Sequence, residues 1–361
     1  MHYFTGNHDQ GAVALLQTAM RELSDQLAGM ALPGLSGVFL GGGYGRGEGG
    51  VRRLPDGRFT LYNDLDFIVV AESGAGRRAR RRIAEALAAI GRQWRPRLGI
   101  DVDFSRPMTA RQLRRNARTL MMQELLRGHV AIFGDSRLLG GCIPAMHPEE
   151  LPAMEAMRLM LNRGMGLLLA GERLSACGGV PRDQASADFI NRNMNKCVLG
   201  MGDAWLIFTR RYRWDIRDRA VALSGAASED AGSLGTLYPQ AVKLKFSPSS
   251  SFLFQTAEAI ECLRGMWLSV VCALLQLPPP GIPRPPSVRR QLHQFCRRQH
   301  ACSPREFLRW TLRSRTLDFS RSAFDDPVAR VLALLYEAHA RGGAFPASAR
   351  RRLQRLWSVF N

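Results

Sequence analysis

Two aspartates stand one residue apart at the start of an apolar run, and this spacing could hold a metal ion. Asp64 and Asp66 flank Leu65, and the run 67–70 follows. Alternate side chains of a β-strand share a face, so both carboxylates lie on one side and Leu65 points toward the core. Neighbouring carboxylates repel each other unless a cation separates them, and Mg²⁺ binds such oxygens while leaving places for phosphate. A third acid stands on a second strand-like run, 100–104.

A glycine-rich stretch, 41–50, follows the strand-like run 37–40. Glycines allow a tight turn and let the backbone approach phosphate groups closely. Arg46 stands where a dinucleotide-binding fingerprint has its third glycine, and no Gly-Lys-Ser/Thr follows as in a P-loop. A strand, a glycine turn and acids on neighbouring strands together suit phosphoryl transfer with two metal ions.

These motifs resemble those of the polymerase-β-type nucleotidyltransferase superfamily. The resemblance lies in Gly42–Glu48, in Asp64-Leu65-Asp66 and in Asp101, and it covers roughly residues 36 to 135. The superfamily includes aminoglycoside adenylyltransferases, CCA-adding enzymes and cyclic-dinucleotide synthases. Beyond these residues the likeness is general, in that a helical domain follows the catalytic one.

The resemblance implies a role for each matched residue. Gly42 and Gly43 would lie against a triphosphate through their backbone N–H groups. Asp64 and Asp66 would bind two Mg²⁺ ions, with Mn²⁺ as a substitute. Asp101 would complete the second metal site and orient the acceptor hydroxyl. The expected nucleotide is ATP or another NTP.

The chain departs from the family pattern in two places, and a third point stays open. Gly43 stands where a serine is common, and the spacing from Gly43 to Asp64 is longer than usual, with a hairpin expected around 55–57 to take up the excess. The third acid is Asp101 or Asp103, which share a strand face; Asp101 is preferred, and both are candidate metal ligands. Arg46, within the glycine motif, is a further candidate for binding the nucleotide.

The second half of the chain offers weaker candidates for binding the nucleotide. Asn162 and Arg163 could present an amide and a guanidinium, or could simply belong to a core helix. Only three of the 50 basic residues are lysines, so a retained lysine indicates a need for a compact ammonium. Lys196 is the strongest of these for a triphosphate contact, although a surface pair with an acid such as Asp203 is an equal alternative. The other two, at 243 and 245, are weaker candidates for a phosphate-binding loop.

The elements that must position these residues divide the chain into an α/β catalytic domain, 1–145, and an all-α domain, 146–361. The first is expected to contain a mixed sheet, because strand-like runs alternate with helical spacing. Its expected helices are 11–27, 77–91 and 111–127, and its expected strands are 37–40, 65–70, 98–104 and 130–133. In the second, the expected helices are 149–170, 186–211, 251–277, 286–300, 304–312 and 326–345, with a loop over 224–250.

Composition limits the class of protein. A chain of 361 residues that is 46% hydrophobic and 22% charged excludes disordered and collagen-like chains. The longest apolar run, 265–277, is too short for a membrane span, and no signal peptide is visible at the N-terminus. Seven cysteines without an export signal favour reduced thiols, so a cytoplasmic location and no membrane partner are expected.

The expected activity is transfer of an NMP, first of all AMP from ATP, onto a hydroxyl of a small-molecule or glycan-like acceptor. A net charge of +19 makes nucleic acid a further candidate partner. The alternative is therefore an enzyme that modifies RNA or tRNA, or one that synthesises cyclic dinucleotides. A non-catalytic nucleotide-binding regulatory module is the alternative from another class.

Overall fold

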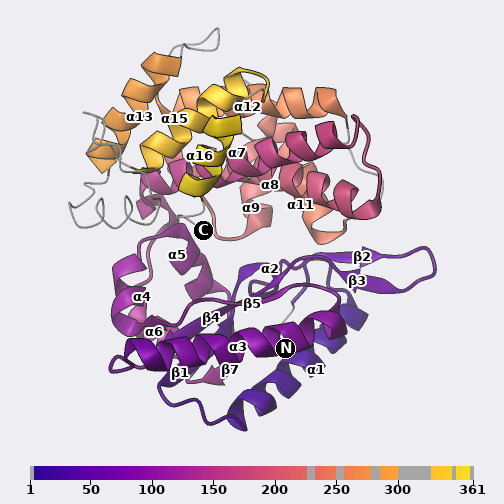
Figure 1. Ribbon diagram of the computed structural model, residues 1–361, viewed down its shortest axis with the longest axis vertical. Helices are drawn as coiled ribbons and strands as arrows, with labels where there is room; N and C mark the ends of the chain where they lie inside the picture. Colours follow the sequence, from indigo (N-terminus) through magenta and orange to yellow (C-terminus); the bar gives the residue numbers. More distant parts are fainter. Residues whose placement is uncertain are drawn as a thin grey trace. The chain divides into compact units, whose positions relative to one another are not determined.

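The computed structural model divides into two compact units (Figure 1). It describes residues 4–225, 232–248, 256–277, 285–299, 327–343 and 347–357. The first unit consists of Met1–Leu151 together with Val242–Ser251, and the second of Pro152–Ala241 and Phe252–Asn361. The sequence places the boundary at residue 145 and does not assign the segment near 245 to the first unit.

The first unit is mixed α/β, as predicted, and is built on a mixed sheet. The sheet order is β5-β4-β1-β7, with β6 pairing to β4 as well. β1 runs antiparallel to β4 and β7, whereas β4 is parallel to β5 and β6. The strands are β1 (Leu35–Leu40), β4 (Leu65–Ala71), β5 (Val102–Phe104), β6 (Met108–Thr109) and β7 (Val130–Gly134). The hairpin expected around 55–57 is present as β2 (Val51–Arg53) and β3 (Phe59–Leu61).

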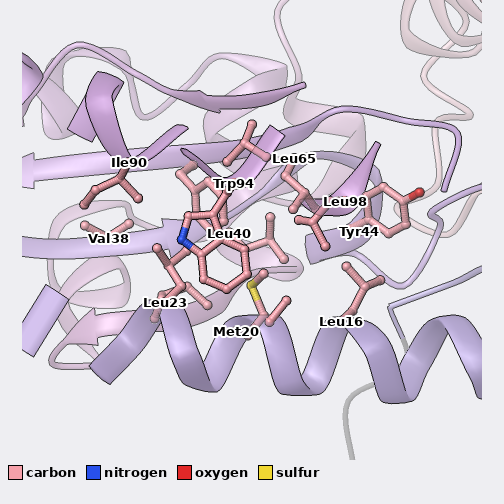
Figure 2. Close-up of a cluster of buried hydrophobic side chains, with 14 of the residues drawn as sticks. Leu16, Met20, Leu23, Val38, Leu40, Tyr44, Leu65, Ile90, Trp94 and Leu98 are labelled. Carbon is pink, nitrogen blue, oxygen red and sulfur yellow. The ribbon is translucent and has the colours of Figure 1, made fainter. Parts of the chain in front are cut away.

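Period-two alternation sends the side chains of each central strand into two separate cores. Val38 and Leu40 of β1, with Leu65 of β4, pack against α1 (Gln10–Ala28) and α3 (Arg77–Leu98) on one face. Figure 2 shows this core, in which side chains of α1 and α3 approach those of the strands. The apolar stripes that the helical spacing predicts therefore meet the sheet.

The other face of the sheet has its own core. Phe39 of β1 and Val70 of β4 pack there with Met122 and Leu125. The covering helices are α4 (Ala110–Asn116), α5 (Leu120–Arg127) and α6 (Leu138–Cys142). Because Asp66 alternates with Leu65 and Phe67, it belongs to this second face.

Helix α3 extends further than the sequence spacing indicates. It was expected to end near Gly91 but continues to Leu98, because Trp94 and Leu98 prolong its buried stripe. Pro96 lies in the last turn, where the loss of one backbone hydrogen bond is tolerated, and Gly99 ends the helix in a left-handed conformation. The strand expected over 98–104 is accordingly reduced to β5.

The helix expected over 111–127 is two helices. Thr109 caps α4 with a capping box formed with Gln112. Thr119 then accepts a hydrogen bond from the backbone N–H of Met122 and so begins α5. The second cap breaks the single helix, because its side chain satisfies backbone donors that a continuous helix would use.

In the described residues of the second unit every regular element is a helix, as predicted. The helices are α7 (Ala153–Ala176), α8 (Gln184–Phe208), α9 (Ile216–Ser224), α11 (Leu234–Phe246), α12 (Ala257–Leu274), α13 (Pro285–Gln299), α15 (Pro327–Ala340) and α16 (Ala347–Trp357). The expectation of a loop over 224–250 was wrong at α11, where Leu234, Tyr238 and Ala241 form a buried helical stripe. The helix expected over 304–312 lies outside the described residues. No helix in the described part of the chain is long and apolar enough to cross a membrane.

A buried tryptophan and histidine join three helices of the second unit. Trp267 of α12 donates its indole N–H to the carbonyl of Met160 in α7 at 3.0 Å. His339 of α15 lies 4.7 Å from the Trp267 ring, and its Nε2 is 2.9 Å from the carbonyl oxygen of Gly164 in α7. Burial lowers the pKa of His339 to about 4, against the opposing hydrogen bond to Gly164. The folded protein therefore keeps this imidazole neutral.

His339 is expected to make the protein sensitive to acid. Below pH 6.5 His339 is protonated in the unfolded chain, whereas in the folded chain it stays neutral until about pH 4. The free energy of unfolding therefore falls as the pH decreases through this window. The loss is on the order of 3 kcal/mol, from about 1.4 kcal/mol per pH unit. Urea denaturation between pH 4 and 7 should show a smaller pH dependence for His339→Phe than for the wild type. Parallel pH profiles would contradict this account.

Candidate functional site

The glycine turn is held against β4 by its own backbone. After β1 the chain forms the short helix α2 (Gly42–Gly45), and the N–H of Gly41 donates to the carbonyl of Asp66 at 2.8 Å. Gly42 has φ of 61°, and a Cβ there would stand 2.6 Å from Oδ2 of Asp66. Only glycine combines this conformation with so close an approach of a carboxylate. The turn and the first acid of the candidate site are therefore adjacent.

A buried tyrosine fixes the far side of the turn. Tyr44 is fully buried, and its hydroxyl donates to the carbonyl of Gly50 at 2.8 Å and accepts from the N–H of Tyr62 at 3.1 Å. Asn63 accepts a hydrogen bond from the N–H of Gly50 at 2.7 Å. These bonds connect the end of the glycine-rich stretch to the residues that immediately precede Asp64.

The acids lie on neighbouring strands. Asp66 of β4 is directly opposite Asp103 of β5 in the parallel ladder, so the two side chains share a face of the sheet. Burial raises the pKa of Asp103, and the negative charges of Asp101 and Asp64 raise it further, whereas Arg95 lowers it. The mutual repulsion expected between these carboxylates is therefore present at Asp103.

Asp101 differs from the other acids because a cation accompanies it. Its Oδ1 lies 2.9 Å from a guanidinium nitrogen of Arg95 in α3, and its side chain is 46% exposed. Asp103, which the sequence left as the second choice, is the acid that faces Asp66 across the ladder. The oxygen donors of Asp64, Asp66 and Asp103 suit Mg²⁺ chemically. Among the described residues, however, no three acids, histidines or cysteines lie close enough together to form a ready metal site.

Arg46 is engaged by two carboxylates. Its Nε and one terminal nitrogen each lie 3.2 Å from Oε2 of Glu48, and the other terminal nitrogen lies 3.1 Å from Glu124 of α5. The same oxygen of Glu48 accepts from Nζ of Lys245. Sequence reasoning missed this contact, since almost 200 residues separate the partners; the rarity of lysine was the only available signal.

Asn162 and Arg163 lie on α7 of the second unit. The Asn162 side-chain oxygen accepts a hydrogen bond from the indole N–H of Trp357 at 3.3 Å. Arg163 lies against Gly200 of α8, in agreement with tight packing of α7 on α8. These contacts give both residues structural roles, and their proposed contact with a nucleotide stays a prediction.

Lys196 lies half-buried on α8, as expected from the helical spacing. The acid seven residues later, Asp203, accepts hydrogen bonds from the hydroxyl of Tyr238 at 2.6 Å and pairs with buried Arg219 at 3.0 Å. Asp203 thus belongs to an internal polar cluster, while the triphosphate contact of Lys196 stays a prediction.

Comparisons of the chain with protein-family models, with curated proteins and with solved structures gave no match.

The contact between Gly42 and Asp66 predicts a sharp difference between neighbouring glycines. Gly42→Ala is expected to cost at least about 2 kcal/mol, because the left-handed backbone penalises a Cβ and the new methyl meets Asp66. At Gly43 an added Cβ would make only an ordinary contact, 3.6 Å from the carbonyl oxygen of Glu48, so Gly43→Ala is the matched control. Urea denaturation of both variants measures the difference; equal stability would contradict the described turn.

Proposed function

We propose that the protein is a nucleotidyltransferase that moves an NMP from an NTP, first of all AMP from ATP, to an acceptor hydroxyl. In this reaction the acceptor oxygen forms a bond to the α-phosphorus, the bond to pyrophosphate breaks, and the hydroxyl proton is released. The acceptor class that we favour is a small molecule or a glycan-like alcohol.

The observation that carries the proposal is the contact between the glycine turn and the acidic strand. Gly42 touches the Asp66 carboxylate, and Asp66 faces Asp103 across the ladder. The glycine turn therefore lies beside an acid of β4, whose partner in the ladder is a second acid; this arrangement supports transfer between phosphate and hydroxyl groups.

The glycines and the aspartates would have different roles in this reaction. Gly42 and Gly43 would lie along the triphosphate, because neither has a side chain of its own to keep phosphate oxygens away from its backbone N–H. Asp64, Asp66 and Asp103 would hold two Mg²⁺ ions by their carboxylate oxygens. When bound, the metal ions would lower the pKa of the acceptor hydroxyl and stabilise the departing pyrophosphate.

Asp103 is our choice for the third acid, in place of Asp101. Asp103 is paired in register with Asp66, and its pKa is raised by burial and by the charges of Asp101 and Asp64, so a metal ion would stabilise its ionised form. Asp101 is already accompanied by Arg95. Asp101 would then not bind a metal ion directly. Arg46, which is paired with two carboxylates, would stabilise the conformation of the turn.

Substitution of the acids tests the proposal without knowledge of the acceptor. Asp66→Asn and Asp103→Asn should each weaken binding of Mg²⁺–ATP by about tenfold or more, as measured by calorimetry, because each removes a charged metal ligand. Without ligand, Asp103→Asn should melt at the same or a higher temperature, since burial and the charges of Asp101 and Asp64 disfavour ionised Asp103. Asp56→Asn, an exposed acid of the hairpin, is the control.

The outcomes of this experiment distinguish between the alternative functions and between the two candidates for the third acid. Absence of Mg²⁺-dependent ATP binding by the wild type would overturn the proposal. Wild-type affinity in Asp103→Asn together with loss in Asp101→Asn would make Asp101 the third acid. ATP binding without release of pyrophosphate in the presence of diverse alcohols would favour the non-catalytic regulatory module.

One observation favours a nucleic-acid acceptor as a second candidate. The segment 104–123 contains five arginines and no acid. Arg111 and Arg114 lie on α4 and Arg118 follows its end; all three are exposed, and none has an ion pair among the described residues. Such a row of unneutralised guanidinium groups suits a phosphate backbone.

A matched pair of triple variants tests this second candidate. Arg111→Gln/Arg114→Gln/Arg118→Gln should weaken binding of a single-stranded RNA oligonucleotide and reduce the salt dependence of log K by about 2, for three lost phosphate contacts. The control removes the same charge from α3 by changing residues 77, 78 and 82 to Gln. Fluorescence anisotropy at several salt concentrations measures both. Equal weakening in the two variants would mean that net charge alone attracts RNA.

A further inference from the structure

A segment from late in the chain packs on the glycine-rich stretch of the first unit. Residues 242–251 belong to this unit, and α11 ends there at Phe246, which is buried. A Cβ at Gly50 would stand 2.4 Å from the carbonyl oxygen of Lys245, so the two backbones are in direct contact. Asn7 also donates a hydrogen bond to the hydroxyl of Ser247 at 3.4 Å. The backbone at Lys245 is therefore fixed by packing.

Lys245 is the last of four connected side chains whose charges alternate in sign. Its Nζ lies 2.5 Å from Oε2 of Glu48, which also binds Arg46, and Arg46 in turn binds Glu124. The side chains of Glu48 and Lys245 are 6% and 15% exposed, so solvent screens their interaction only weakly. The backbone N–H of Glu48 donates to the carbonyl of Gly43 at 2.7 Å. The ion pair is thus connected directly to the turn.

The charge of Glu48 explains why a cation is needed at position 245. Without Lys245, Glu48 would lose a cationic partner 2.5 Å away, and more of its negative charge would be left uncompensated. That charge would stand beside a turn that already contacts Asp66, and it would repel a polyphosphate.

We propose that Lys245 is a positioning residue of the glycine turn: by pairing with Glu48, it holds the turn in shape and reduces the negative charge that an anionic ligand would meet there. It acts through Glu48 and does not itself need to touch the ligand. The identity of that ligand as a nucleoside triphosphate rests on the function proposed above, whereas the effect on the turn does not.

The first test compares lysines two residues apart in ATP binding. At low salt, Lys245→Met should weaken Mg²⁺–ATP binding by about tenfold or more, and the exposed control Lys243→Met by less than about twofold, as expected for a partly buried and an exposed charge. Glu48→Gln/Lys245→Met removes one charge of each sign and should recover most of the affinity. A double variant as weak as Lys245→Met would overturn the charge argument.

The second test needs no ligand and so separates this inference from the proposed function. Hydrogen exchange of the backbone amides of residues 41–48 should be at least about fivefold faster in Lys245→Met, and unchanged in Lys243→Met, because the turn loses its anchor locally. Unchanged exchange would overturn the positioning role even if ATP binds. If wild-type protein binds no ATP but exchange accelerates as expected, the positioning role stands and the proposed ligand is wrong.

Discussion

The candidate site depends on the alternation of side chains along β4, a strand paired on both sides. Its odd-numbered residues, Leu65, Phe67 and Val69, enter the core formed with α1 and α3. The same pleat directs Asp66 to the opposite face, where the glycine turn meets it. A shift of one residue in register would bury the acid and expose the apolar side chains, so the core that stabilises the first unit also fixes the position of the acid.

The glycine turn adds a second constraint, because it lies close to a carboxylate and, in the proposed function, would also accept an anion. The close approach is made by Gly42, and the turn is anchored by the buried hydroxyl of Tyr44. The negative charges of Glu48 and Glu124 are paired with the positive charges of Arg46 and Lys245. Paired charges of this kind stabilise the turn only modestly, but in the proposed function they would influence which ligands can approach it.

Because the chain is rich in arginine, the contacts of individual cations are more informative than the total charge. Most arginines in the described chain are exposed, and single surface pairs contribute little to stability. Those that are buried belong to defined clusters, such as Arg219, which is bound by the hydroxyls of Tyr212 and Tyr238. Net charge by itself therefore does not locate a binding site. The burial and ion pairing of particular cations show which of them have a defined place in the structure.

The sequence by itself determined most of the local elements of the first unit. Period-two and helical spacing located the strands, the two amphipathic helices α1 and α3, and the glycine turn next to an acidic strand, because these signals depend only on neighbouring residues. The C-terminal end of α3 and the break between α4 and α5 were missed, since buried contacts of Trp94 and a side-chain cap at Thr119 decided them. Only the tertiary structure placed Asp103 opposite Asp66 and Lys245 beside Glu48. Strand register and contacts between distant segments arise from the packing of the whole unit, and no local pattern encodes them.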